Sequence, residues 1–257
     1  MQSLEESVVK AMDGSDNELF GHLPYMLQDI WEFGADPDAM IQLIEKHCTK
    51  YHKLKILDLG CGKGAVSIKT ANNFKCTCYG IDAVGEFIEV AKQKAAQWNV
   101  GHLCTFETAD IRTKIDTLSD FDVVILGAIG PVFGDYFATL SALSKCISQN
   151  GIILIDDGVI DDSSNFSHPM MYKKSEIMNQ AQKAGMQMID FDDIDKNEIE
   201  ESDDYIFNKL KNRCEELMIK NPQKKHLFEN YLKQQEIEND VLENKVLGAT
   251  MVFKKQE

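Results

Sequence analysis

The chain lacks long apolar runs, C-x-x-C cysteine pairs and an excess of basic side chains. No apolar stretch of its 257 residues reaches the roughly 18 residues of a membrane-spanning helix. The first twenty residues also lack the apolar centre of a signal peptide. The seven cysteines are scattered, with no C-x-x-C pair, which disfavours a zinc site and favours reduced core thiols. We therefore expect a cytoplasmic protein that does not bind membranes.

Basic residues are outnumbered by acids. Lysine and arginine total 27 against 42 aspartates and glutamates, for a formal net charge of −15. Such a chain repels phosphate backbones, so nucleic acid is not expected as a partner. The basic cluster Lys224-Lys225-His226 stands among acids and is typical of a solvated helix face. The acidic run over residues 190–204 is interpreted as a solvated loop, with metal binding as a weaker alternative.

Strand and helix patterns alternate between residues 54 and 190. The expected strands cover residues 55–59, 77–81, 104–108, 121–126, 151–156 and 186–191, with a last strand at 249–254. The expected helices between them cover residues 65–74, 86–98, 135–148 and 174–184. This alternation predicts an α/β fold: a Rossmann-like, seven-stranded, mostly parallel sheet with helices on both faces.

Two regions fall outside that alternation. Before the first strand, residues 23–34 and 36–50 have helical patterns. Before the last strand, residues 197–245 form a mostly helical insert, which Asn221-Pro222 interrupts. We expect the N-terminal region to form a helical lid and the insert to form a roof over the ligand pocket from the other side.

A glycine-rich turn follows the first strand, in the sequence Ile56-Leu57-Asp58-Leu59-Gly60-Cys61-Gly62-Lys63-Gly64. Glycines permit positive φ and close approach of a ligand to the backbone, and the next helix offers free N–H groups. Asp82 ends the second strand about 20 residues after Gly62, where an acid binds ribose hydroxyls in Rossmann-type folds. Together these features predict a nucleoside-binding site.

Two classes of nucleoside ligand compete for this turn. The dinucleotide pattern G-x-G-x-x-G/A is met only if Ala65 takes its last position. Asp58 would repel a diphosphate but attract the ammonium group of an amino acid. Charge therefore favours S-adenosylmethionine over NAD. An NAD-binding oxidoreductase and a non-catalytic nucleotide-binding protein remain the alternatives.

The same residues resemble the motifs of class I S-adenosylmethionine-dependent methyltransferases. The stretch ILDLGCGKG is similar to their first motif, Gly80-Ile81-Asp82 to the acidic motif that follows, and Ala109-Asp110-Ile111 to the third. Residues 121–127 and 151–157 resemble the fourth motif and the fifth strand. The resemblance implies the strand order 3-2-1-4-5-7-6, with residues 247–255 as the antiparallel seventh strand.

The resemblance also implies a set of cofactor contacts. Asp82 would bind the ribose hydroxyls and Asp110 the adenine amino group, with Ile111 packed on the ring. The implied set within the sheet domain is Asp58, Gly60, Cys61, Gly62, Gly64, Asp82, Ala83, Asp110, Ile111 and Gly127.

The domain organisation follows from this resemblance. Residues 1–50 are expected to form the lid segment, and residues 51–257 the methyltransferase domain with its insert. In the lid, Tyr25 and Gln28 are expected to contact the cofactor, with Trp31 as a third candidate. The alternative is that these side chains only pack the segment onto the sheet edge.

The reaction itself needs little from the protein. Methyl transfer is an in-line displacement with a neutral thioether leaving group, so positioning can suffice and no single catalytic residue is expected. His168 and Tyr136 are candidate bases, with structural roles as the alternative. Residues 127–131 (GAIGP) lack the N/D-P-P-Y/F motif of amino-methylating nucleic-acid and protein enzymes. Asp135, Asp156 and Asp157 are alternative metal ligands, but acids at strand ends are usually solvated, so no metal is expected. A closed pocket favours a small-molecule methyl acceptor.

Overall fold

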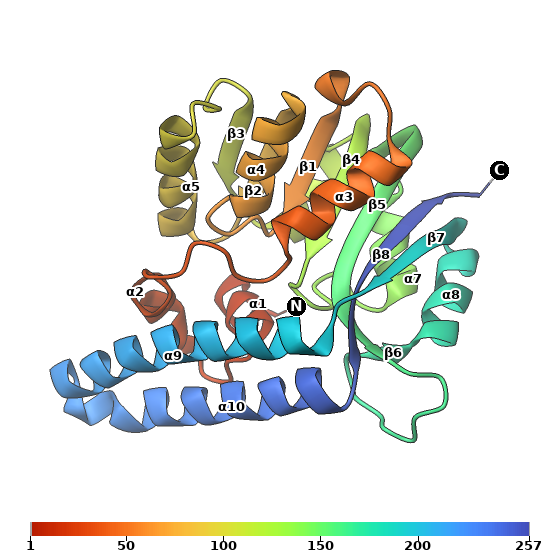
Figure 1. Cartoon of the computed structure of the whole chain (residues 1–257). Coiled ribbons are helices and arrows are strands. Elements are labelled where there is room, and N and C mark those ends of the chain that lie inside the picture. Colours follow the sequence, from red (N-terminus) through yellow and green to blue (C-terminus); the bar gives the residue numbers. More distant parts are fainter. Residues whose placement is uncertain (1, 257) are drawn as a thin grey trace.

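A twisted, mostly parallel sheet forms the centre of the molecule, which a computed structural model describes over residues 2–256 (Figure 1). The main path of strands is β3-β2-β1-β4-β5-β8-β7, and β8 runs antiparallel to both neighbours. Their bounds are β1 Lys55–Leu59, β2 Thr77–Asp82, β3 Cys104–Thr108, β4 Phe121–Gly127, β5 Ile147–Ile160, β7 Met186–Asp193 and β8 Leu247–Lys255. The predicted Rossmann-like fold and strand order are confirmed.

Helices cover both faces of the sheet because its strands are apolar on both sides. Ile56 packs into the core beneath α3 (Pro37–His47), α4 (Ala65–Phe74) and α5 (Gly85–Gln97). The next residue, Leu57, packs on the other face, beneath α7 (Tyr136–Leu143) and α8 (Lys174–Lys183). The α3 helix therefore belongs to the layers around the sheet, although its sequence lies in the expected lid.

The fifth strand differs from its prediction. It begins at Ile147 and ends at Ile160, so the preceding helix is shorter than residues 135–148. The extension persists because β8 pairs with β5 as far as Val159. The end of β5 also pairs with a two-residue strand, β6 (Tyr172–Lys173), which the sequence did not predict.

The insert is a helical hairpin. Helices α9 (Lys196–Lys220) and α10 (Lys225–Asn244) lie side by side below the sheet in Figure 1, joined by the short helix η4 (Pro222–Lys224). The break at Asn221-Pro222 is thus confirmed. The loop expected at residues 190–204 is wrong, because these acids complete β7 and begin α9. There the side chain of Asp195 accepts a hydrogen bond from the backbone N–H of Asn197.

The N-terminal region contains α1 (Leu4–Ala11), the short helix η1 (Asn17–His22) and α2 (Leu23–Met26). The helix expected over residues 23–34 is wrong beyond Met26, where α2 ends. The backbone carbonyl groups of Leu27 and Ile30 instead accept hydrogen bonds from the Lys63 ammonium group. Helix α1 was not predicted, although Ser3 and Glu6 form a capping box. The remaining short helices are η2 (Tyr51–Lys53), α6 (Ile111–Lys114) and η3 (Ile115–Thr117).

A third apolar core joins the N-terminal region to the hairpin. It buries Leu23, Met26 and Ile30 against Leu210, Phe228 and other residues of α9 and α10. The two regions that flank the sheet in sequence thus form one layer over its lower end. Among the described residues, no helix combines the length and apolar character needed to cross a membrane.

Candidate functional site

A cavity of about 640 Å³ lies between the sheet and the layer formed by the N-terminal region and the hairpin. The carboxyl ends of β1, β2, β4 and β5 contribute its floor, as expected for a ligand site in an open α/β sheet. Nine predicted contacts line it: Asp58, Gly60, Cys61, Gly62, Asp82, Ala83, Asp110, Ile111 and Gly127. The structure therefore brings together residues that span 70 positions of sequence, from Asp58 to Gly127.

Gly62 and Gly64 have different roles in the turn after β1. Gly62 lines the cavity with φ of +51°, and a Cβ there would lie 2.9 Å from the ring of Phe33. Gly64 does not line the cavity. A Cβ on Gly64 would lie 2.9 Å from the ring of Phe106, so this glycine permits close packing of α4 on the sheet.

Asp82 both faces the cavity and shapes the glycine turn. Its Oδ2 accepts a 2.8 Å hydrogen bond from the N–H of Gly62, and its Oδ1 accepts one of equal length from Val84. Burial raises the pKa of Asp82, while these backbone donors oppose the rise. A ligand hydroxyl that donates to Asp82 would therefore bind a carboxylate already fixed in place.

Asp58 lies under the turn and is 3% exposed. Its Oδ2 accepts a 2.7 Å hydrogen bond from the Ser67 hydroxyl. Burial raises the pKa of Asp58 to about 6, and the charge of Asp82 adds to this rise. The floor of the cavity thus favours a cationic group over a phosphate.

Asp110 follows β3 and pairs with Arg112 through a 2.7 Å contact between Oδ2 and Nη2. It also caps α6 by accepting the N–H of Arg112. The guanidinium holds the pKa of Asp110 below its usual value. Ile111 is buried beside it on the cavity wall.

Gly127, at the end of β4, lies where the N-terminal segment crosses the sheet. A Cβ at this position would come within 2.7 Å of the Cβ of Ala35. Both residues line the cavity, so the glycine allows the segment to pass close over the strand end.

Two predicted lid contacts lie away from the cavity. The Tyr25 hydroxyl donates to Glu216 and accepts a 2.6 Å hydrogen bond from Lys220, both on α9. Gln28 is exposed, and neither Tyr25 nor Gln28 is on the cavity wall. Trp31 does line the cavity, and its Nε1 donates to the Lys63 carbonyl over 3.0 Å. Phe33 joins Trp31 on the wall but was not predicted.

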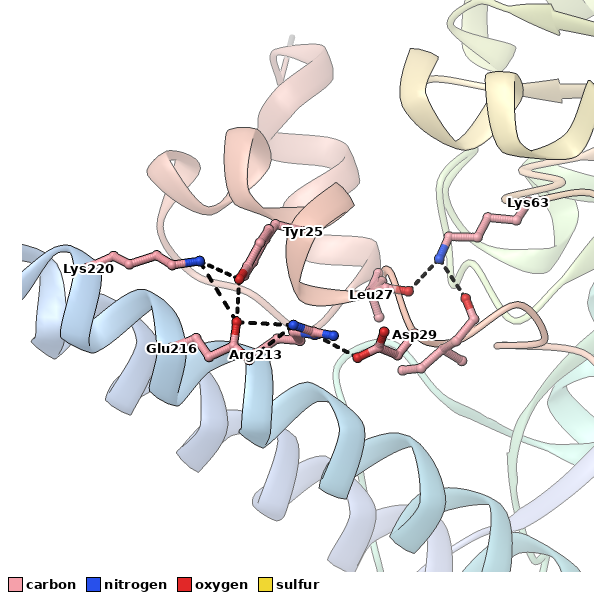
Figure 2. A network of polar contacts seen from close by, with 8 residues as sticks. Tyr25, Leu27, Asp29, Lys63, Arg213, Glu216 and Lys220 are labelled. Atoms are coloured by element: carbon pink, nitrogen blue, oxygen red, sulfur yellow. Dashed lines mark hydrogen bonds and ion pairs between the residues drawn. The ribbon is translucent and has the colours of Figure 1, made fainter. Parts of the chain in front are cut away.

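Lys63, in the glycine turn, is the main residue that sequence reasoning missed. Its side chain is buried, and its ammonium group donates to the carbonyl oxygens of Leu27 and Ile30, the latter at 2.6 Å. Burial lowers the pKa of Lys63 to about 8. Figure 2 shows how this contact clamps the segment that contains Asp29.

The clamped segment is also tied to the hairpin. Asp29 accepts a 2.6 Å hydrogen bond from Nε of Arg213, and Arg213 pairs with Glu216 at 3.0 Å (Figure 2). Polar contacts therefore run from the glycine turn through the N-terminal segment to α9. These contacts therefore couple the position of α9 to that of the glycine turn.

The two candidate bases do not line the cavity. Tyr136 donates to Asp157 over 2.9 Å, and burial raises its pKa far above the usual value. His168 accepts a 3.3 Å hydrogen bond from the N–H of Met170. In contrast, Asp156 and Asp157 do line the cavity, and burial raises their pKa values to about 7 and about 6.

The acids considered as metal ligands have other partners. Asp135 caps α7 through the N–H of Ala138, Asp156 accepts from Thr250, and Asp157 accepts from Tyr136. Within residues 2–256, no group of three or more histidine, cysteine or acidic side chains is arranged to hold a metal ion.

A family model described as a methyltransferase domain matches residues 50–209. Malonyl-[acyl-carrier protein] O-methyltransferase of Bacillus cytotoxicus is 33% identical over 117 residues, which cover 45% of this chain and 39% of that protein. Ubiquinone biosynthesis O-methyltransferase of Bartonella tribocorum is 27% identical over 124 residues, or 48% of this chain and 46% of that protein. The aligned part thus spans less than half the length of each relative.

The fold extends the similarity to nearly the whole chain. A SAM-dependent methyltransferase from Thiobacillus denitrificans, solved in complex with S-adenosyl-L-homocysteine, superposes with a TM-score of 0.73 at 15% identity. The superposition covers 91% of this chain and 98% of that one. At this identity the likeness concerns the fold.

Proposed function

The chain belongs to the family of methyltransferase domains, and from that premise we propose that it transfers the methyl group of S-adenosylmethionine to a small-molecule acceptor. The observation that carries the proposal is the shared cavity wall of the glycine turn, Asp82 and the clamped segment at Trp31. The structural neighbour from Thiobacillus denitrificans, solved with S-adenosyl-L-homocysteine, supports the choice of ligand.

The residues on the cavity floor fit the parts of this cofactor. Asp82 suits the ribose hydroxyls, with Ala83 beside it, and Ile111 offers an apolar surface to adenine near Asp110. Gly60, Cys61, Gly62 and Gly127 leave the backbone open to the methionine part, and Asp58 supplies negative charge near its ammonium group. We propose that residues 2–36 act as the lid, with Trp31 and Phe33 in place of Tyr25 and Gln28. Gly64 supports the turn from behind.

The proposed chemistry rests on positioning. S-adenosylmethionine, when bound, supplies a sulfonium methyl group whose leaving group is a neutral thioether. The chain's own task is to hold an acceptor in line and to exclude water, which can account for about 7–11 kcal/mol of a barrier. The Lys63 clamp and the hairpin suit that task because they close the cavity from two sides.

The proposal favours small acceptors over nucleic acid. The cavity wall carries many acids, and its roof consists of helices whose acids would repel phosphate. The seven cysteines are free thiols, which suits a reducing compartment such as the cytoplasm.

Titration calorimetry of the full chain with S-adenosylmethionine, S-adenosylhomocysteine and NAD tests this function. We expect S-adenosylmethionine and its product to bind, and NAD to bind at least ten-fold more weakly. Tight binding of NAD without binding of S-adenosylmethionine would contradict the proposal and favour a redox function. Binding of the cofactor with no methyl transfer to any of a broad metabolite pool would favour a non-catalytic protein.

A further inference from the structure

The roof of the cavity carries three carboxyl groups from three different segments. Asp13 follows α1, Asp203 lies on α9, and Glu238 lies on α10, and all three line the cavity. Burial, together with the charges of Glu238 and Asp203, raises the pKa of Asp13 to about 7, although the hydrogen bond from Gln235 opposes the rise. Segments far apart in sequence thus bring carboxyl groups together on the wall of one cavity.

Among residues 2–256, no basic side chain on the cavity wall pairs with these carboxyl groups. The basic residues on the cavity wall are Lys10, Lys63 and Arg112. Lys63 binds carbonyl groups of the lid, Arg112 binds Asp110, and Lys10 is exposed. Buried carboxyl groups without a cation are costly unless a proton or a ligand neutralises them.

Gln235 donates a 3.2 Å hydrogen bond to Oδ2 of Asp13, but two other polar atoms at this end of the cavity lack partners in the described part of the chain. Oδ2 of Asp203 is sealed from solvent and has no hydrogen-bond partner among the described residues. Tyr231 is 3% exposed and lines the cavity next to Asp13. Its hydroxyl forms no hydrogen bond with a residue within 2–256, although the side chain is on the cavity wall. A buried hydroxyl on a cavity wall without a partner indicates a site for a polar ligand group.

Apolar side chains surround this polar end. Val8 and Met12 approach from the α1 side, Phe207 from α9 and Leu242 from α10. The complementary molecule has a positive group at one end and an apolar body, with the positive group close to several carboxylates.

From this arrangement we propose that the methyl acceptor is an amine that binds as its ammonium form among Asp13, Asp203 and Glu238, with its apolar part against Phe207 and Leu242. This inference rests on the proposed methyltransferase function and adds the class of acceptor. In the reaction, the ammonium gives one proton to a carboxylate of the cluster. The freed nitrogen lone pair forms the N–C bond as the C–S bond breaks, its electron pair remains on sulfur, and the methylated amine carries the positive charge.

Binding of a matched pair of probes tests the charge preference. N-methylbenzylamine is a cation near neutral pH, and benzyl methyl ether is its neutral counterpart of similar shape. With S-adenosylhomocysteine present, we expect the amine to bind the full chain at least about ten-fold more tightly than the ether. Turnover should yield the tertiary amine from N-methylbenzylamine and no ether from benzyl alcohol.

Charge-removing variants locate the site. Asp203→Asn and Glu238→Gln should each weaken amine binding by about ten-fold while S-adenosylhomocysteine binding stays unchanged. Glu236→Gln is the matched control, because Glu236 lies on the same helix, is exposed and does not line the cavity. Equal binding of amine and ether, binding of neither, or equal effects of Glu238→Gln and Glu236→Gln would overturn the inference. If the unmodified chain did not bind S-adenosylhomocysteine at all, the proposed function would be overturned instead.

Discussion

The ammonium group of Lys63 lies 2.6 Å from the carbonyl oxygen of Ile30, 33 residues earlier in the chain. The same group binds the Leu27 carbonyl, and Trp31 donates in return to the carbonyl of Lys63. The glycine turn and the N-terminal segment are therefore fastened to each other at the cavity edge. The position of the N-terminal segment over the turn thus depends on contacts of one buried side chain.

Replacing Lys63 with methionine should loosen this contact. The side chain keeps most of its apolar length, but two carbonyl groups lose their donor, at a cost on the order of 1–3 kcal/mol. We expect a lower melting temperature and about ten-fold weaker S-adenosylmethionine binding by calorimetry. Lys92→Met is the control, since Lys92 is exposed and pairs with Glu89 on its own helix. Unchanged cofactor affinity in Lys63→Met would show that the clamp has no role in binding.

Asp82→Ala should weaken the binding of S-adenosylmethionine by about ten- to a hundred-fold, because a charge-assisted hydrogen bond contributes roughly 1.5–3 kcal/mol. The melting temperature should also fall, because the backbone N–H groups of Gly62 and Val84 lose their acceptor. Asp122→Ala separates the two effects. Asp122 accepts the N–H of Lys55 at the other end of the sheet, so its loss should lower stability without changing affinity. If Asp82→Ala and Asp122→Ala bound S-adenosylmethionine equally well, Asp82 would not contact the cofactor.

The stability of the ligand-free protein should fall as the pH rises from about 5 to about 7. Five carboxyl groups have pKa values raised by burial to about 6 or 7: Asp13, Asp58, Asp156, Asp157 and Asp203. Between their unfolded and folded pKa values the folded state binds more protons, so raising the pH favours unfolding. His22, whose pKa is lowered, has the opposite effect, and Lys63 acts mainly above this window.

Chemical denaturation across this pH range measures the effect. A midpoint that rises with pH would contradict the burial of these carboxyl groups in the folded state. Asp156→Asn should reduce the slope, because its pKa is among the highest of the five. An exposed control, Glu236→Gln, should leave it unchanged.

The sheet and most of its ligand-binding edge were predictable because their signals are local. Apolar runs that end at glycines or acids define β1, β2 and β4, and the residues that follow them meet at one edge of a parallel sheet. The side chains of the lid were not predictable in this way. Tyr25 turns to Glu216, 191 residues later, and the helix that would have aimed Gln28 inward ends at Met26. Lys63 gave only a faint signal, as a lysine within a tight glycine turn.

Phe228→Ala should separate the stability of the roof from that of the sheet. Phe228 is fully buried in the third core, where its ring meets the ring of His22 at a centroid distance of 5.1 Å. Removing a buried phenylalanine costs about 3–5 kcal/mol, and here the lost contacts join the hairpin to the N-terminal region. Hydrogen exchange measured by mass spectrometry should therefore show faster exchange in residues 2–36 and 197–245, while β1 and β4 stay protected.

Phe74→Ala provides the matched comparison, because Phe74 is nearly buried in the core between α4 and the sheet. Its loss should weaken protection across the sheet instead. If Phe228→Ala loosened β1 and β4 as much as the hairpin, the roof and sheet would unfold as one unit. Ligand entry would then need a route other than local opening of the roof. If only the roof loosened, amine and cofactor affinities should fall together in Phe228→Ala, since both ligands need the closed layer above the glycine turn.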